Sequence, residues 1–172
     1  MDSLECYEKI RKVLADFEKA RKSERRISVT ELAKKIASPR SHGGSWQKGF
    51  SVHEKVWGDP LEVCMHEEYW TPLPLAYKFG DTWIYGVADY VHFINGIPVD
   101  VVELKYFNDA DKYSKVQVAI YGWLVLKNFN VRPIVWLVLG WNGRRFKNRI
   151  KVDEEVEILI KNTLERLSNL IE

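Results

Sequence analysis

The stretch "TWIYGVADYVHFINGIPVDVVELKYF", residues 82–107, decides the fold because it reads as two long strands joined by a tight turn. Asn95-Gly96 lies between two runs of β-branched and aromatic residues, which is a strong signal for a two-residue hairpin. Since side chains alternate between the faces of a strand, Glu103 and Lys105 point the same way. Two charged side chains therefore enter one apolar layer.

The preceding strand also places a charged residue, Asp89, in an apolar layer. An apolar face is expected there, and only Asp89 interrupts it; its other members are Trp83, Tyr85, Val87, Val91 and Phe93. A buried ionised group is costly unless it is paired, hydrogen-bonded or bound to a metal. One interpretation is a cross-strand network in which Lys105 neutralises Glu103 or Asp89. The other is a metal site, because the tight turn can bring both carboxylates together, and hard oxygen ligands suit Mg²⁺ or Mn²⁺.

The rest of the chain predicts an α/β fold with a central mixed sheet of about five strands flanked by helices. We expect one domain over residues 1–172, with an N-terminal helical segment (1–45), a core (46–151) and a C-terminal helix (152–172). Helices are expected over 3–26, from a capping box at Ser28 and Glu31, within 46–57, over 112–128 and after 152. Strands are expected over 61–79, 82–93, 97–107, 132–141 and 144–152.

Composition narrows the class of protein. With 172 residues, 46% of them hydrophobic, the chain suffices for one well-buried core, and its net charge of +2 favours no partner. No apolar run reaches the roughly 18 residues of a membrane span, so we expect a soluble, cytoplasmic protein.

Cys6 in a helical pattern and Cys64 in a strand pattern are interpreted as two buried free thiols. Many charged residues beside two glutamines favour a thermophilic source, archaeal or viral.

Three motifs occur in order along the core. "GVADYV", then "PVDVVELKY", then "QVAIYGW" resembles the PD-(D/E)XK nucleases, specifically the RecB-like exonucleases and the CRISPR-associated exonucleases related to them. An upstream helix motif, Gly-x-x-x-His, is similar as well. The matching residues are Gly49 with His53, Gly86 with Asp89, Glu103 with Lys105, and Gln117 with Tyr121. The resemblance spans residues 28–128.

The resemblance implies a restriction-endonuclease-like fold and a metal-dependent deoxyribonuclease. The Mg²⁺ or Mn²⁺ ligands would be His53, Asp89, Glu103 and the backbone carbonyl of Leu104, and Lys105 would position the attacking water. Gln117 and Tyr121 are four residues apart and share one helix face, where they could hold Lys105 and contact a phosphate or base. Plain packing is the alternative for that pair.

One part of the family pattern is missing. Many CRISPR-associated members carry a Cys-Pro-Arg element after the second helix and three further cysteines that together bind an iron–sulfur cluster. This chain reads Ser38-Pro39-Arg40 at the matching place and has no cysteine after Cys64. Four cysteine ligands cannot come from two cysteines, so we expect no iron–sulfur cluster, which puts a CRISPR role in doubt.

A basic segment follows the core. Arg145, Lys147, Arg149 and Lys151 alternate at period two, which is typical of a sequence-blind phosphate track or of an edge strand protected by charge. Trp46 and Tyr106 are candidates for stacking on bases.

These features together predict a hydrolase of DNA phosphodiester bonds, and we favour an exonuclease acting on single strands or ends. The alternatives are a junction-resolvase-like endonuclease acting as a two-fold dimer and an inactive nucleic-acid-binding subunit. A homo-oligomer, or protein partners in a recombination, repair or replication complex, fits this prediction. No membrane partner is expected.

Overall fold

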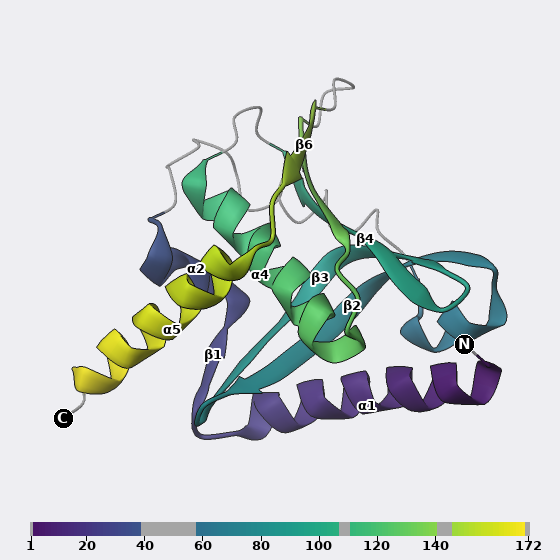
Figure 1. Cartoon of the computed structure of the whole chain (residues 1–172), viewed down its shortest axis with the longest axis horizontal. Helices are drawn as coiled ribbons and strands as arrows, with labels where there is room; N and C mark the ends of the chain where they lie inside the picture. The colour runs from purple at the N-terminus through teal and green to yellow at the C-terminus, as the bar shows by residue number, and fades with distance from the viewer. Residues whose placement is uncertain (1, 39–57, 107–110, 141–145, 171–172) are drawn as a thin grey trace.

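The computed structural model describes residues 2–38, 58–106, 111–140 and 146–170 (Figure 1). The helix expected within 46–57 lies outside these ranges. The helices are α1 (Ser3–Lys22), α2 (Val29–Ile36), the 3₁₀ helix η1 (Pro60–Met65), α4 (Lys112–Phe129) and α5 (Glu154–Asn169). The strands are β1 (Arg26–Ser28), β2 (Glu68–Phe79), β3 (Thr82–Ile94), β4 (Ile97–Lys105), β5 (Ile134–Leu139) and β6 (Phe146–Ile150).

The strands form one mixed sheet of six. Its order is β1-β3-β4-β5-β6, and β2 pairs with β3. β1 runs parallel to β3 and β4 runs parallel to β5, whereas the other pairs are antiparallel. The α/β class with a mixed sheet flanked by helices is thus confirmed, and it is compatible with the expected nuclease-like fold. The sheet has six strands rather than about five because β1 occupies three residues between two helices.

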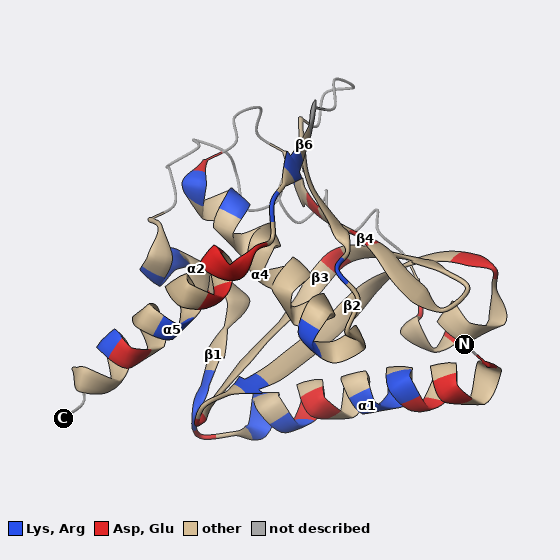
Figure 2. Ribbon diagram, viewed as in Figure 1, with Lys and Arg blue, Asp and Glu red and all other residues tan. Residues whose placement is uncertain are grey.

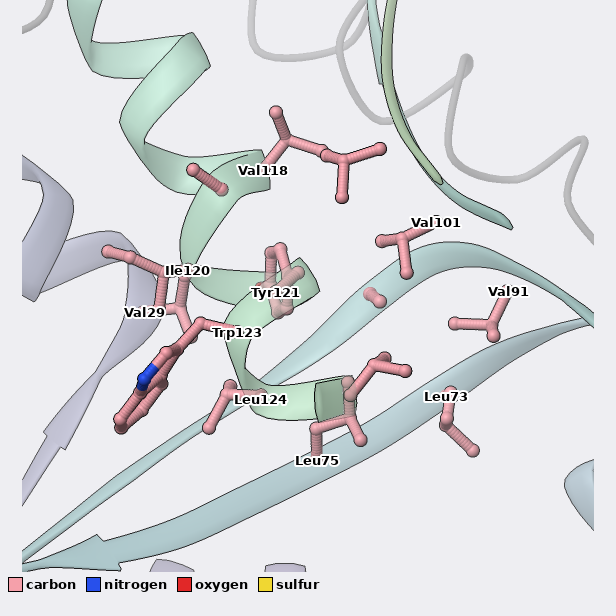
Figure 3. Close-up of a cluster of buried hydrophobic side chains, with 14 of the residues drawn as sticks. Val29, Leu73, Leu75, Val91, Val101, Val118, Ile120, Tyr121, Trp123 and Leu124 are labelled. Carbon is pink, nitrogen blue, oxygen red and sulfur yellow. The ribbon is translucent and has the colours of Figure 1, made fainter. Parts of the chain in front are cut away.

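The helices cover the sheet through apolar contacts. α4 packs on β2, β4 and β5, α2 and α5 pack on α4, and α1 lies along β2 and β3 (Figure 1). Between α4 and the strands lies a cluster of buried side chains that includes Leu73, Val101, Tyr121 and Leu124 (Figure 3). The helix starts follow local sequence, since the side chain of Ser28 accepts the N–H of Glu31, which confirms the predicted cap.

A β-bulge in β3 corrects the predicted strand face. Thr71 of β2 is opposite Val91, but Leu73 is opposite Ala88, so three steps along β3 match two along β2. The extra residue reverses the alternation of side chains. Ile84 and Ala88 before the bulge and Val91 and Phe93 after it are therefore buried. The single apolar face expected from Trp83, Tyr85, Val87, Val91 and Phe93 is wrong, since Val87 is exposed and Trp83 and Tyr85 are half-buried.

The two cysteines are joined in a disulfide that ties α1 to η1. The prediction of two free thiols is therefore wrong, and Cys64 lies in a 3₁₀ helix rather than a strand. Asp59 caps that helix and Pro60 begins it, which outweighs the strand-like spacing of its apolar residues.

The predicted Asn95-Gly96 turn is confirmed, because both residues have positive φ. A Cβ at Gly96 would lie 2.9 Å from Cys6 Sγ, so the turn packs directly on the disulfide. None of the helices in the described ranges is long and apolar enough to span a membrane.

Candidate metal and catalytic centre

Two carboxylates meet where the bulge of β3 faces β4. Tyr90 is opposite Val102, which brings the neighbouring residues Asp89 and Glu103 together. Asp89 Oδ2 accepts the backbone N–H of Leu104 at 2.8 Å. Glu103 is only 3% exposed, and its Oε2 has no hydrogen-bond partner. The structure thus confirms that the hairpin places these two acidic residues side by side.

The charges of this centre are unbalanced. Burial raises the pKa of Glu103 well above its ordinary value, the adjacent Asp89 raises it further, and Lys105 opposes both effects. Lys105 Nζ forms an ion pair with Glu103 Oε1 at 3.6 Å, as the cross-strand interpretation predicted, although this distance is longer than a hydrogen bond. With both carboxylates ionised, one lysine cannot neutralise them. A proton or a metal cation in this cavity would balance the remaining negative charge.

The carboxylates line a cavity of about 430 Å³. Residues from α2, β2, β3, β4 and α4 surround this cavity, so it is assembled from segments far apart in sequence. Of the predicted site residues it contains Asp89, Glu103, Lys105, Gln117 and Tyr121. Such a pocket with convergent polar groups is the usual form of a small-molecule or reaction site.

Gln117 and Tyr121 reach the cavity from α4, and both are buried. Gln117 Oε1 has no hydrogen-bond partner. Burial raises the pKa of Tyr121 well above its ordinary value, Glu103 and Asp89 raise it further, and a hydrogen bond with the Val87 backbone lowers it. Tyr121 is therefore a neutral phenol that can donate a hydrogen bond into the cavity.

Gly86 allows Tyr121 to reach its place. A Cβ on Gly86 would lie 2.8 Å from the Tyr121 hydroxyl oxygen and 3.0 Å from Val29 Cγ2. Contacts below 3.0 Å do not occur for real Cβ atoms without a shift of the neighbour. The Gly-x-x-Asp spacing thus has a packing reason, since Gly86 admits the phenol and Asp89 carries the charge.

Two further residues of the centre were not predicted. Lys105 Nζ lies 5.8 Å from the centroid of the Tyr113 ring, so Tyr113 is the aromatic ring that faces this lysine. Thr30 of α2 lines the cavity. The sequence held a signal for Tyr113, because it precedes Gln117 by four residues, as Gln117 precedes Tyr121. The sequence held no such signal for Thr30, since this residue belongs to α2, a separate helix.

Two further metal ligands were predicted, His53 and the backbone carbonyl of Leu104. His53 lies outside the described ranges. Leu104 is at the centre through its N–H, and ligation by its carbonyl remains a prediction. Within residues 2–38, 58–106, 111–140 and 146–170, no group of three or more His, Cys, Asp and Glu side chains is arranged to hold a metal ion. The described part of the chain therefore supplies two carboxylates.

The predicted nucleic-acid contacts lie apart from this cavity. Arg145, Trp46 and the side chain of Lys147 are outside the described ranges. Arg149 and Lys151 are exposed and lie near the start of β5, because Ile150 pairs with Val135. Figure 2 shows basic segments, in blue, in β6 and in the chain between β6 and α5. Tyr106 is half-buried.

Comparison with known proteins identifies no family. No family model matches the chain, and no curated protein matches it. Among solved structures, the chain is similar to one described as "Crystal structure of SSO0001", with 23% identity over 88% of this chain and 83% of that chain. The TM-score is 0.47. At that identity and TM-score, the similarity assigns no function to this chain.

Proposed function

We propose that the protein is a metal-dependent nuclease that hydrolyses DNA phosphodiester bonds. The observation that carries this proposal is the buried carboxylate pair, in which Glu103 Oε2 has no hydrogen-bond partner and Lys105 is too far away for a hydrogen bond. A structural charge network would be expected to satisfy these atoms. A buried carboxylate oxygen without a hydrogen-bond partner beside a second carboxylate suits a divalent cation, which would take the place of a proton shared by the pair.

The residues fit Mg²⁺ or Mn²⁺ because their donors are hard oxygens. Asp89 and Glu103 would hold the ion, with His53 and the Leu104 carbonyl as the further ligands that the family resemblance implies. When bound, such an ion lowers the pKa of water and polarises a phosphoryl oxygen.

The side chains around the pair have separate roles in this proposal. Lys105 orients the attacking water, since it is the cation beside Glu103. Tyr121 donates a hydrogen bond from its neutral hydroxyl toward a phosphate oxygen. Gln117 has a buried carbonyl oxygen without a partner, which can accept a hydrogen bond from the water or from Lys105.

Cleavage of defined DNA substrates tests the proposal and its mode. End-labelled single-stranded, duplex and four-way-junction DNA are incubated with the protein in Mn²⁺, Mg²⁺ or EDTA. Metal-dependent laddering from one end supports an exonuclease, and paired internal cuts confined to the junction support the resolvase-like alternative. Binding without cleavage in any metal would leave only the inactive nucleic-acid-binding subunit.

A further inference from the structure

The sheet face opposite the catalytic cavity carries a row of aromatic side chains. α4 packs on the sheet face to which Val101 and Glu103 of β4 point. Side chains alternate along a strand, so the residues at the intervening positions of β4 point to the opposite face. There, Trp70, His92, Asp100 and Ile134 are paired in succession from β2 to β5. The next row consists of Tyr90, Val102, Trp136 and Arg149. We call Trp70, Tyr90, His92 and Trp136 the aromatic face.

Trp70 is the most accessible ring of the aromatic face. Its indole stacks on the imidazole of His92, with centroids 4.0 Å apart and planes 3° from parallel. Tyr90 meets Trp70 edge-on at 5.7 Å. Trp70 is nevertheless 40% exposed. A large aromatic ring that is fixed from one side and open to solvent is suited to stack on a flat ligand.

A hydrogen-bond network fixes the rings. His92 Nδ1 lies 2.8 Å from Asp100 Oδ2, and His92 Nε2 lies 2.7 Å from Glu68 Oε1. Trp136 Nε1 donates to the other Asp100 oxygen, Oδ1, at 2.9 Å. These bonds cross from β2 to β5 and set the orientation of rings on different strands. Rings held in this way lose little conformational entropy when a ligand binds.

A cationic cavity lies at the edge of the aromatic face. Its volume is about 530 Å³, and its lining includes Arg132, Arg149 and Lys151 but no acidic residue. Ile134 lines it too and is also the last residue of the Trp70 row. Arg132 is oriented by a hydrogen bond from Nη1 to the Val152 carbonyl at 3.3 Å. Lys151 also pairs with Asp153 at 3.7 Å, so Arg132 and Arg149 are the two cations of the cavity that lack an acidic partner among the described residues, and they make it complementary to phosphate.

We infer that the aromatic face and the cationic cavity together bind single-stranded nucleic acid. Unpaired bases stack on Trp70 and its neighbours, while the backbone phosphates lie at Arg132, Arg149 and Lys151. A duplex keeps its bases stacked inside and offers these rings nothing to stack on. This inference rests on the proposed function, because it names single-stranded nucleic acid as the substrate of the proposed nuclease.

Binding to a labelled oligothymidylate in EDTA tests the inference without cleavage. Trp70→Ala is expected to weaken binding by roughly tenfold or more, since one base–aromatic stack contributes about that much. Trp70→Phe should restore most of the affinity because it keeps a ring. Arg149→Glu should weaken binding and reduce its salt dependence by about one released counterion. Arg149 is exposed, so this variant does not disturb the core.

Matched controls are Trp83→Ala, at the start of β3, and Arg11→Glu, on the exposed side of α1. Both should bind as the wild type does, and circular dichroism with thermal unfolding establishes that every variant is folded. The inference is overturned if folded Trp70→Ala and Arg149→Glu bind as tightly as the wild type. Equal affinity for a matched duplex, or a dimer in sedimentation that Trp70→Ala dissociates, also overturns it. If the wild type cleaves DNA but Trp70→Ala binds it as tightly as the wild type does, the role of the aromatic face is refuted and the nuclease proposal stands. If Trp70→Ala weakens binding but the wild type cleaves no DNA in any metal, the nuclease proposal is refuted and the binding inference stands.

Discussion

Glu103 is a carboxylate that the fold buries with no hydrogen-bond partner for its Oε2 atom. Burial and then Asp89 raise its pKa above that of the unfolded chain. The folded protein therefore binds this proton more tightly than the unfolded chain does. Without metal, the free energy of unfolding should fall as the pH rises from the ordinary pKa of a glutamate through the raised folded-state pKa.

Glu103→Gln should remove that loss. In EDTA at neutral pH we expect the variant to be more stable than the wild type by roughly 1–3 kcal/mol, because a neutral amide replaces a buried charge. Thermal unfolding over acid to alkaline pH measures the difference, which should vanish at acid pH. Mn²⁺ should stabilise the wild type and not the variant. Parallel stability curves for the two proteins would contradict the assigned charge.

The close packing of Gly86 against Tyr121 can be tested by adding a side chain at residue 86. Gly86→Ala places a methyl group against the Tyr121 hydroxyl and Val29, so we expect a loss of about 1–3 kcal/mol in the free energy of unfolding. Urea unfolding measures this loss. Adding Tyr121→Phe removes the atom at 2.8 Å, so the double variant should lose less than the sum of the two single changes. Additive losses would show that Gly86 is not in contact with this phenol.

Among the secondary-structure elements, α1 and η1 are linked covalently by Cys6–Cys64. The disulfide closes a loop with a sequence separation of 58, so its removal should cost about 2–4 kcal/mol of stability. Urea unfolding with and without reductant measures this cost in the wild type. The variant Cys6→Ser with Cys64→Ser is the reference, because its stability should not depend on reductant. A wild type that is equally stable under both conditions would contradict the disulfide.

Elements with a local signal could be predicted from the sequence. Asn95-Gly96 specified its turn, Ser28 with Glu31 specified the start of α2, and the helix expected over 112–128 is observed as Lys112–Phe129. The bulge in β3 could not be predicted, since it depends on how many residues of β2 lie opposite. The disulfide could not be predicted either, because its two cysteines meet only after α1 has packed beside η1.

In the molecule as a whole, the positions of Asp89 and Glu103 were more predictable than those of the residues around them. Asp89 and Glu103 are joined by one hairpin, so their meeting follows from local pairing. Thr30 and Tyr113 come from α2 and α4, and their positions depend on how these helices pack on the sheet. The aromatic face was missed because Trp70 and Trp136 resemble core residues in a chain with seven tryptophans. Only the pairing of β2 through β6 shows that they share one side.

We propose that Asp89, Glu103 and Lys105 form a metal-dependent hydrolytic centre. The most direct test is the rate of cleavage of end-labelled single-stranded DNA in Mn²⁺ by the wild type, Lys105→Ala and the matched exposed-lysine control Lys161→Ala. The wild type and the control should cleave at equal rates, and EDTA should abolish both activities. Lys105→Ala should be slower by about 100-fold or more, since it loses the group that positions water. Equal rates for Lys105→Ala and the wild type, or cleavage that persists in EDTA, would contradict this account.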